Sequence, residues 1–428
     1  MHCAAIDGYL SGTDAFMWSL GVDPVLRSTI VTLILFDRPP DWKSVVDRFD
    51  RISRAVPRFR QRVVRAAPLW APRWEADPDF DLGSHLHRLT EPEFRESNLL
   101  ELAGTVAMAG YDRNRPLWEA TLVDGLADGS AALLCKFDHS LTDGVGAVHI
   151  AQVLYDDAPG PGEGAVVPSR SFDSVSRAVT TLRHPVTAVR AVAPTALSIY
   201  RAARPIAGPR SPIMRSRTPT RYLDVLEVSR PALQLAGRVA GGSLNDAFVA
   251  AVTGGLRRYH EHHDVSVEEL VMLMPISTRS QQDAAGGNRA TLMRLPVPVG
   301  VTDPARRIRE LHERTSKARG EKSVAYTQLI AASLNAMPRS YIGSQLRRID
   351  FVASDVPGFP TPLQLGGAPV RMQYAFSPTL GASVNITLLT YVDTCAIGIN
   401  IDTGAIPDPD VLHDCLAAGF DETIAVAA

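Results

Sequence analysis

His139 and Asp143 are the two residues whose types and spacing could carry out proton transfer. A neutral imidazole titrates near neutral pH, so His139 could take the proton from an attacking hydroxyl and later return it to a leaving group. Asp143 follows too closely to be assumed a partner of the imidazole; its alternative role is to pair with a distant arginine and hold the turn. Gly144 would let the backbone bend there. A lone histidine at the end of a strand is more often structural, so other residues must decide between these interpretations.

The elements around His139 are predicted from hydrophobic periodicity. Residues 130–137 read as a mostly buried strand and residues 144–155 have apolar residues at helical spacing, so His139 lies in the turn between them. Residues 117–123 are expected to pair with that strand in a hairpin. Further strands are predicted at residues 28–36, 270–274, 292–299, 382–391 and 395–401, and helices at residues 42–55, 245–259 and 304–317. This is an α/β pattern, and a turn of this kind presents its side chains to a cleft.

An ordered series of motifs runs along nearly the whole chain. Pro116-Leu117-Trp118 precedes the histidine, and Asn245-Asp246 opens a helical segment. The other members are residues 10–16 (LSGTDAF), 57–62 (PRFRQR), Trp74, residues 77–82 (DPDFDL), His85, residues 275–279 (PISTR), Gly287-Asn288 and residues 354–358 (SDVPG). In this order the motifs resemble the bacterial wax ester synthase/diacylglycerol acyltransferase family. That family belongs to the coenzyme A-dependent acyltransferase superfamily with the signature His-x-x-x-Asp-Gly.

The resemblance implies both a fold and an activity. The fold would be α/β, with two chloramphenicol-acetyltransferase-like domains and the active site in a tunnel between them. We assign residues 1–165 to the N-terminal domain, 166–221 to a basic linker rich in proline and arginine, and 222–428 to the C-terminal domain. His139 would deprotonate a diacylglycerol or a long-chain alcohol, which would attack the thioester of a long-chain acyl-coenzyme A directly. The product would be triacylglycerol or a wax ester, with acyl-coenzyme A as co-substrate and no cofactor.

Two positions depart from the family pattern. The family usually has His-His-x-x-x-Asp-Gly, whereas Asp138 stands in place of the first histidine; Asp355 stands where the family usually has asparagine before Val-Pro-Gly. A carboxylate beside His139 would raise the pKa of the imidazole and weaken it as a base, unless Asp138 points away from it. The alternatives are therefore an acyltransferase for another alcohol acceptor or a carrier-bound substrate, a weak or inactive relative that binds acyl chains or lipid surfaces, and a structural partner of an active paralogue.

Three polar side chains in the second half are candidates to stabilise an oxyanion. Ser383, Asn385 and Thr387 alternate along a predicted strand and could supply hydrogen-bond donors. Arg279, at the end of the segment 271–279, is the predicted ion-pair partner of Asp143, with a surface arginine as the alternative. His85-Leu86-His87 and residues 260–263 lack the His-Glu-x-x-His spacing, so no metal site is expected.

Composition agrees with a two-domain enzyme. The chain of 428 residues is 45% hydrophobic, enough for two sizeable cores, and its net charge of −2 gives no argument for nucleic acid. Cys3, Cys135, Cys395 and Cys415 are scattered, which predicts neither disulfides nor zinc and fits a reducing cytosol. The N-terminus does not resemble a signal peptide, and residues 28–36 are too short to span a bilayer. We expect a cytoplasmic protein, either free or peripheral at the inner membrane or lipid droplets, and do not predict its oligomeric state.

The segment from residue 170 to residue 221 has a charge bias of its own. It contains ten arginines against the single acid Asp173, and apolar residues separate them. One interpretation is a basic amphipathic segment that lies on anionic lipid and draws a water-insoluble acceptor from it. A second is a connection whose arginines are solvated, and a third is contact with the phosphates of coenzyme A. The sequence leaves these three open.

Overall fold

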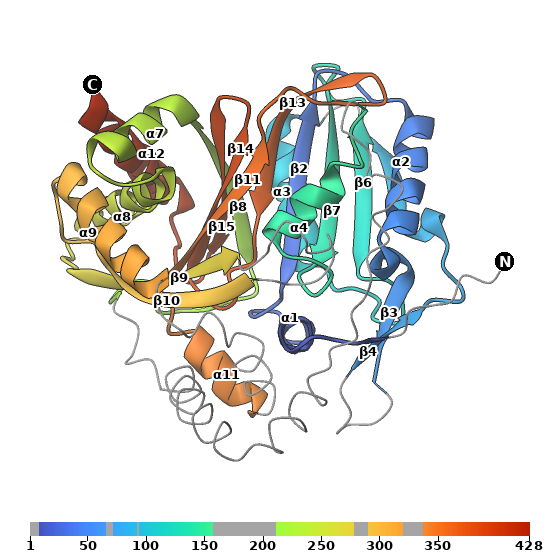
Figure 1. The fold of residues 1–428 in the computed structure, drawn as a ribbon, viewed down its shortest axis with the longest axis horizontal. Coiled ribbons are helices and arrows are strands. Elements are labelled where there is room, and N and C mark those ends of the chain that lie inside the picture. Colours follow the sequence, from blue (N-terminus) through green and yellow to red (C-terminus); the bar gives the residue numbers. More distant parts are fainter. Residues whose placement is uncertain (1–7, 66–71, 92–93, 157–210, 278–289, 320–336) are drawn as a thin grey trace, which may run out of the picture.

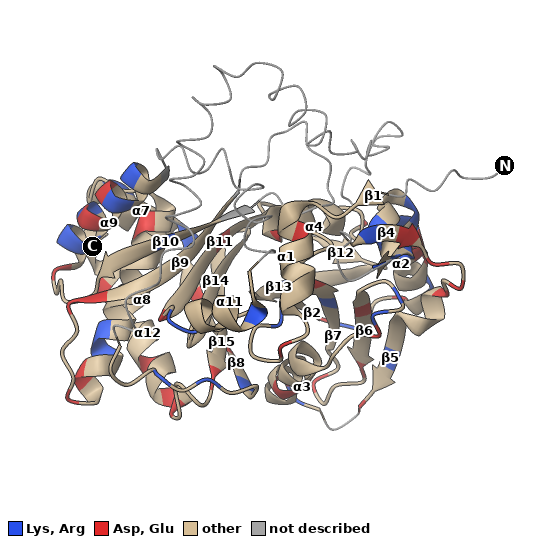
Figure 2. Cartoon of the chain, turned by 90° about the horizontal axis from the view of Figure 1, so that it is seen from below, with Lys and Arg blue, Asp and Glu red and all other residues tan. Residues whose placement is uncertain are grey.

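The computed structural model describes residues 8–65, 72–91, 94–156, 211–277, 290–319 and 337–428. Two six-stranded sheets lie side by side, each with helices on it (Figure 1). A small third sheet, in the order β1-β4-β3, joins β1 (Gly8–Tyr9), β4 (Arg73–Ala76) and β3 (Gln61–Val64). In Figure 2 the charged residues lie mainly on the outer helices and loops, while the strands at the centre carry few of them.

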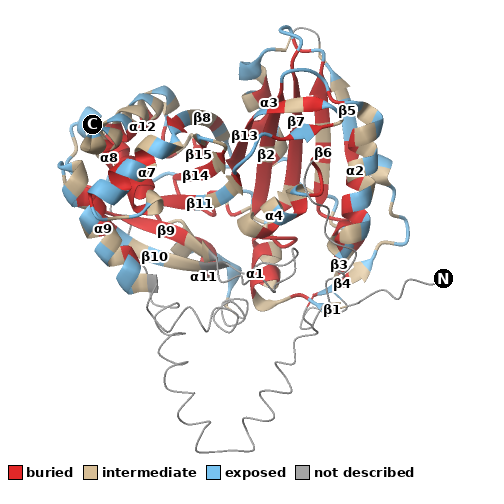
Figure 3. Cartoon of the chain, turned by 45° about the horizontal axis from the view of Figure 1, so that its top comes forward, coloured by how far each residue is buried: buried red, intermediate tan, exposed pale blue. Residues whose placement is uncertain are grey.

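The first sheet has the order β12-β13-β2-β7-β6-β5. Its members are β12 (Gln364–Leu365), β13 (Ala368–Phe376), β2 (Thr29–Phe36), β7 (Ala131–Asp138), β6 (Trp118–Asp124) and β5 (Leu86–Thr90). β6 and β7 are antiparallel, which confirms the predicted hairpin. Helix α3 (Glu96–Met108) packs against β2 and β7 on one face, and α2 (Trp42–Ala55) and α4 (Gly144–Ala151) lie on the other. Because helices cover both faces, β2 and β7 are almost continuously apolar and buried (Figure 3).

Strands β12 and β13 come from late in the chain but belong to this first sheet. β13 pairs antiparallel with β2, with Gln373 opposite Ile34 and Tyr374 opposite Leu33. The sequence division at residue 222 places these strands in the second domain, whereas the structure places them beside β2. Without β13, the apolar strand β2 would be an open edge, and an exposed apolar edge invites pairing with other chains.

The second sheet has the order β10-β9-β11-β14-β15-β8. Its members are β10 (Ala290–Pro298), β9 (Glu269–Ser277), β11 (Phe351–Phe359), β14 (Val384–Tyr391), β15 (Thr394–Asp402) and β8 (Arg221–Ser229). The helices of this half are α7 (Arg230–Val239), α8 (Leu244–His262), α9 (Pro304–Arg319) and α12 (Pro409–Ile424). α8 and α12 approach closely at Gly419, where an added Cβ would lie 2.4 Å from the Ala251 carbonyl oxygen. The predicted helices at residues 245–259 and 304–317 are confirmed.

A third apolar cluster joins the two halves. Helix α1 (Gly12–Leu20) contributes Phe16 and Met17, which pack with Leu273 and Val352 of the second sheet and with Ile342 of α11 (Arg339–Leu346). α1 and α11 lie at the same end of the molecule, below both sheets in the view of Figure 1. The position of the first half relative to the second is therefore fixed by side-chain packing as well as by the crossing of β13.

The described end of the basic segment is part of the folded second half. The backbone N–H of Ser211 donates to Asp350 over 3.2 Å, and Arg217 donates to the carbonyls of Gly381 and Ile349. The side chain of Arg221 is 3% exposed and forms a 3.3 Å ion pair with buried Asp402. Arg217 and Arg221 thus serve the fold, not a lipid surface. The predicted linker before residue 211 lies outside the described residues.

Two absences hold for the described ranges. None of their helices combines the length and apolar character that crossing a membrane requires. Nor do these ranges bring together three or more histidine, cysteine, aspartate or glutamate side chains in a way that could hold a metal ion. In each of the two histidine motifs that the sequence offers, one buried histidine contacts other parts of the protein: His85 Nδ1 is 2.8 Å from the Trp118 carbonyl oxygen, and His260 Nε2 is 2.9 Å from Ser211 Oγ.

His260 makes a pH-dependent contribution to stability. The side chain is 1% exposed, and its Nδ1 lies 2.7 Å from the Leu256 carbonyl oxygen, so the neutral tautomer carries its proton there and accepts from Ser211. Burial lowers the pKa of His260, against the opposing effect of the Leu256 carbonyl and with a further contribution from His263. Because the unfolded chain binds this proton at a higher pH than the folded protein, the stabilisation is complete above the ordinary histidine pKa and is lost as the pH falls below it.

We therefore expect the unfolding free energy to fall between neutral pH and about pH 5 more steeply in the wild type than in His260→Gln. Urea unfolding at a series of pH values measures this difference. His262→Gln, at an exposed position on the same helix, is the matched control and should keep the wild-type slope. Equal slopes in the wild type and His260→Gln would show that His260 does not contribute.

Candidate active site

The turn that carries His139 is fixed at both ends by backbone hydrogen bonds. The N–H of Asp138 donates to the Leu117 carbonyl over 3.0 Å, and the N–H of His139 donates to the Ser28 carbonyl over 2.9 Å. At the other end Asp143 is the N-cap of α4, and its carboxylate accepts from the Gly146 N–H over 2.7 Å. The turn between β7 and α4 is therefore held by neighbouring strands and by the first turn of the helix.

A cavity opens at this turn between the two halves. Its volume is about 150 Å³, and both His139 and Asp143 line it. Other polar wall residues are Thr142 from the same turn, Ser354 and Asp355 from β11, and Asn385 from β14. Their arrangement puts the candidate catalytic residue of the first half opposite polar groups of the second. Asp355, one of the two departures from the family pattern, is exposed on this wall.

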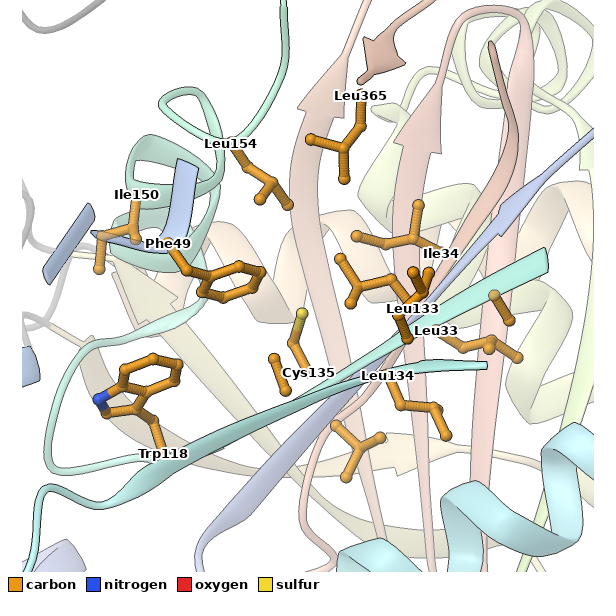
Figure 4. Close-up of a cluster of buried hydrophobic side chains, with 14 of the residues drawn as sticks. Leu33, Ile34, Phe49, Trp118, Leu133, Leu134, Cys135, Ile150, Leu154 and Leu365 are labelled. Carbon is orange, nitrogen blue, oxygen red and sulfur yellow. The ribbon is translucent and has the colours of Figure 1, made fainter. Parts of the chain in front are cut away.

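The cavity continues into the first half as an apolar pocket between the sheet and the helices on it. Its walls there include Ile30, Phe49, Ile52, Phe137, Ile150 and Leu154. In Figure 4, Phe49, Ile150 and Leu154 lie on one side, and the strands that carry Cys135 and Ile34 lie on the other. The residues of β2 and β7 that line the pocket alternate along each strand, as the period of two in a strand requires. The site thus joins a polar junction to an apolar channel.

Asp138 points away from the cavity. Its carboxylate accepts from the Ser140 N–H over 2.9 Å and from the Ser28 hydroxyl over 3.3 Å, and the residue is 4% exposed. It lies on the side of Tyr111 and Arg113: burial raises the pKa of the Tyr111 phenol, and the charge of Asp138 adds to that increase. His139 lines the cavity, whereas Asp138 does not. The carboxylate that the sequence places beside the imidazole therefore belongs to the opposite side of the strand end.

Restoring the usual family residue with Asp138→His is expected to bring no gain in kcat, because the new side chain would not face the cavity. It should lower stability by about 2 kcal/mol through the loss of hydrogen bonds to a buried carboxylate. Asp138→Asn, which keeps an acceptor for Ser28 and Ser140, is the control and should be milder. Steady-state rates and thermal melting of the three proteins measure both effects, and a large gain in kcat for Asp138→His would contradict this geometry.

Arg58 supports the His139 turn from outside the cavity. Its guanidinium donates to the carbonyls of Ser140 and Leu141, over 3.0 and 3.3 Å, and to the Asp14 carboxylate over 3.0 Å. The Asp14 side chain is 1% exposed, and the guanidinium also lies over the ring of Trp74 at 4.8 Å. The sequence points to Arg58, Asp14 and Trp74 only as members of motifs. The sequence does not predict that these residues are in contact, because they are far apart along the chain.

The first turn of α4 packs directly on the second half at Gly144. A Cβ added at this position would lie 3.0 Å from a Val356 methyl on β11, tighter than ordinary contact. Glycine at this position therefore lets the helix and the strand approach each other closely. Arg279, the predicted partner of Asp143, lies outside the described residues. That ion pair stays a prediction.

Pro116-Leu117-Trp118 supports the cavity wall from behind. Trp118 is completely buried, and its indole N–H donates to the Phe59 carbonyl over 2.9 Å. Its ring stacks on Phe49 at 5.7 Å, and Phe49 and Phe59 both line the cavity. Leu117 provides the carbonyl that binds Asp138, and Pro116 precedes it in the turn into β6. The motif thus positions the aromatic wall and the strand end, and does not itself reach the cavity.

Asn245 and Asp246 are not brought to the cavity. Asp246 caps α8 by accepting from the Ser243 N–H over 2.9 Å, and it also accepts from His312 over 2.8 Å and from Thr315 over 3.0 Å. Burial opposes ionisation of Asp246, but these hydrogen bonds outweigh it and lower the pKa of the carboxyl. The structure gives Asp246 a helix-capping role, and neither residue lines the cavity.

Of the three candidate oxyanion donors, Asn385 alone lines the cavity. The Ser383 hydroxyl is turned to the Met214 carbonyl, and the Thr387 hydroxyl donates to Asn385 Oδ1 over 3.1 Å. Asn385 Nδ2 donates one hydrogen to the Pro378 carbonyl over 2.7 Å. An amide nitrogen carries two hydrogens, so a second donor remains on Asn385. The hydrogen bond from the Thr387 hydroxyl to Oδ1 fixes the orientation of the Asn385 amide.

The chain matches two family models in sequence order. Residues 10–248 match the wax ester synthase/diacylglycerol acyltransferase catalytic domain, and residues 286–423 match the C-terminal domain of the same family. The first match alone covers more than half of the chain and contains the His139 turn. The chain belongs to the wax ester synthase/diacylglycerol acyltransferase family. This confirms the family that the ordered motifs predict.

Relatives extend the match over nearly the whole chain. A putative diacylglycerol O-acyltransferase of Mycobacterium tuberculosis is 34% identical over 98% of this chain and 92% of its own length. A probable diacylglycerol O-acyltransferase of the same organism, tgs1, is 29% identical over 99% of this chain and 95% of its own length. The predicted enzyme class, an acyltransferase, is confirmed by the family and by these relatives.

Solved structures confirm the predicted fold. The wax ester synthase/diacylglycerol acyltransferase from Marinobacter aquaeolei VT8 has a TM-score of 0.67 at 22% identity and covers 98% of this chain and 99% of its own. A starter condensation domain of rhizomide synthetase RzmA, solved in complex with C8-CoA and Leu-SNAC, has a TM-score of 0.68 at 14% identity over 98% and 94% of the two chains. At these identities the two structures establish the fold alone, which is the two-domain α/β architecture that the family resemblance implies.

Proposed function

We propose that this wax ester synthase/diacylglycerol acyltransferase family member transfers a long-chain acyl group from acyl-coenzyme A to the hydroxyl of a lipid alcohol, with His139 as general base. The observation that carries this proposal is the cavity itself, where His139 stands at the junction of a polar opening and an apolar pocket. An apolar pocket suits an aliphatic chain, and the polar junction suits the reacting oxygen and thioester. The family description names diacylglycerol as an acceptor and wax esters as a product, and a wax ester forms from a long-chain alcohol.

The proposed reaction begins with His139 as proton acceptor at the polar end of the cavity. His139 accepts the proton of the acceptor hydroxyl as its oxygen attacks the thioester carbonyl, which forms a tetrahedral oxyanion. The oxyanion then collapses, the carbon–sulfur bond breaks, and the proton held by His139 passes to the departing thiolate of coenzyme A. An ester and free coenzyme A are released, and the imidazole returns to its neutral form. Asp143 and Arg58 act by holding the turn, so we class them as positioning residues.

We assign the hydrogen-bond donor for the oxyanion to the second half of the protein. The second hydrogen of the Asn385 amide can donate to the oxyanion from that side of the cavity. Donors that are fixed in place before the reaction are effective because they need no reorganisation. Apolar walls such as Phe137 and Leu380 exclude water, which would otherwise compete with the alcohol. We propose that no cofactor takes part, because acid–base transfer at His139 balances without one.

Direct transfer is favoured over a covalent acyl-enzyme. Cys135 also lines the cavity and is the side chain there with the chemistry of a strong nucleophile. Burial raises the pKa of its thiol to about 12, although a hydrogen bond involving Thr32 works against that increase. The thiolate is the reactive form, so Cys135 stays a neutral part of the wall at physiological pH.

A water-insoluble acceptor must reach the cavity from a lipid phase, so we also propose peripheral contact with a membrane or lipid droplet. Met17 of α1 lines the cavity, and the large apolar side chains of Tyr9 and Val22, on either side of α1 in sequence, are 63% and 54% exposed. Flotation with vesicles of phosphatidylglycerol and diacylglycerol tests this contact. Tyr9→Ser/Val22→Ser should reduce the fraction that floats, and an unchanged fraction would place the contact elsewhere.

The activity is tested with purified protein, palmitoyl-coenzyme A and one acceptor at a time. Dipalmitoylglycerol, hexadecanol and a sugar alcohol are compared, with coenzyme A release and ester identity measured in the same samples. Ester formation from either lipid acceptor, together with an equal amount of coenzyme A, is the expected result. Ester from the sugar alcohol alone would assign a different acceptor class, and no ester from any acceptor would contradict the proposal.

A further inference from the structure

The apolar pocket contains one polar side chain with an unused hydrogen-bonding group. Gln373 of β13 lines the pocket and is 5% exposed. Its Oε1 accepts from the Tyr155 hydroxyl over 2.8 Å, while its Nε2 is buried and has no hydrogen-bond partner among the described residues. Tyr155 is itself completely buried and also lines the pocket. The Gln373 amide thus has one hydrogen-bonded end and one end without a partner, which is unusual for a buried polar group.

Strand register places Gln373 far from the reacting centre. Gln373 lies opposite Ile34, and Ile34 lies opposite Leu133, which is six residues before His139. At about 3.3 Å per residue, that separation is roughly 20 Å along the strand direction. Between them the pocket is lined by Ala375, Thr32 and Cys135 at one level and by Ile30 and Phe137 at the next. A chain that starts at His139 would reach Gln373 only with its distal part.

A plain aliphatic chain would leave the Gln373 amide unsatisfied. A buried donor without a partner carries the full desolvation penalty of the group, which methylene groups cannot offset. If the amide is turned over, Nε2 meets Tyr155 and Oε1 becomes the unpaired atom. A hydroxyl satisfies either orientation, because it both donates and accepts. The ester carbonyls of a diacylglycerol lie next to its free hydroxyl and would remain near His139.

We propose that Gln373, held by Tyr155, recognises a hydroxyl carried by an aliphatic chain remote from its reacting end, so that the preferred substrate has a hydroxylated long chain. This inference rests on the proposed function and names the substrate class of the same pocket. A pocket that hydrogen-bonds a substrate oxygen discriminates against the analogue that lacks it, since the polar group of the protein is then buried without a partner.

The test compares palmitoyl-coenzyme A with ω-hydroxypalmitoyl-coenzyme A, and hexadecanol with its terminal diol, because either substrate could place its chain in the pocket. We expect the wild type to favour one hydroxylated member by about 5- to 100-fold in kcat/KM. Gln373→Leu/Tyr155→Phe replaces both polar partners, so that neither is left buried alone, and should bring this ratio to about one or reverse it. Gln364→Leu, the same change at an exposed position, should keep the wild-type ratio.

Calorimetric binding of the same four ligands gives a readout that does not depend on turnover. If no ester forms but a hydroxylated ligand binds more tightly in the wild type and loses that advantage in Gln373→Leu/Tyr155→Phe, the recognition stands and the proposed catalysis fails. Equal kcat/KM and equal binding for hydroxylated and plain chains would overturn the inference and assign the amide to a bound water. A preference that persists in the double variant would overturn it as well.

Discussion

His139→Ala should lower kcat by about 100- to 10,000-fold, the contribution typical of a positioned general base, with little change in the KM for acyl-coenzyme A. The imidazole acts on a proton in the transition state, whereas the apolar walls that bind the chain remain. The backbone of the turn stays held by Leu117 and Ser28, so the melting temperature should change little. Initial rates of ester formation and a thermal melt of each protein provide the measurement.

His149→Ala is the matched control for this prediction. His149 lies on α4 and is exposed, so the same substitution there should leave kcat unchanged. If His139→Ala keeps more than about a tenth of the wild-type kcat, the histidine is not the base, because general-base catalysis is worth more than that. The structural interpretation of a strand-end histidine would then be the correct one.

Arg58→Ala is expected to affect stability and rate together. It removes the cation beside the buried Asp14 carboxylate and the Nη1 group that donates to the Ser140 and Leu141 carbonyls. Leaving the buried Asp14 carboxylate without its cation costs about 3 kcal/mol of unfolding free energy. The freed turn would also let the His139 imidazole move out of its reactive position, and such a displacement can lower kcat by up to about 100-fold. Urea unfolding and steady-state kinetics measure the two effects.

A positioning role of Arg58 and a purely structural role predict different results for a conservative substitution. Arg58→Lys keeps the charge near Asp14 but cannot bridge three acceptors in the same way, so it should recover more stability than kcat. KM for acyl-coenzyme A should remain near the wild-type value in both variants, since Arg58 does not line the cavity. Arg54→Ala, at a 70% exposed side chain paired with Asp50, is the control and should change neither quantity. Loss of stability without loss of kcat in Arg58→Ala would contradict the positioning role.

The sequence predicts the local part of this structure well. The strand, turn and helix around His139 follow from hydrophobic periodicity, and the hairpin of β6 and β7 follows from two apolar segments joined by glycine-containing turns. The structural role considered for Asp143 has a local component, because its carboxylate caps the helix that begins at Gly144. Each of these features depends on residues that are neighbours in the chain.

The long-range part could not be predicted in the same way. β13 pairs with β2 across more than three hundred residues, and nothing in its own pattern specifies that partner. The same crossing brings Gln373 into a pocket formed mainly by the first half. Arg58 and Asp14 become important because three separate segments meet at the His139 turn. Asn245-Asp246 shows the opposite case, since Asp246 of this conspicuous polar pair caps a helix away from the cavity.

The most direct test of direct transfer at His139 is a single-turnover experiment with palmitoyl-coenzyme A labelled in its acyl group. Protein in excess is mixed with the thioester, first alone and then with hexadecanol or dipalmitoylglycerol, and ester, coenzyme A and protein mass are followed together. We predict no covalent acyl adduct and no coenzyme A release without acceptor, then ester and coenzyme A in equal amounts once acceptor is added, and both products at least about 100-fold more slowly in His139→Ala. An acyl-protein adduct in the absence of acceptor, or undiminished ester formation by His139→Ala, would contradict the mechanism.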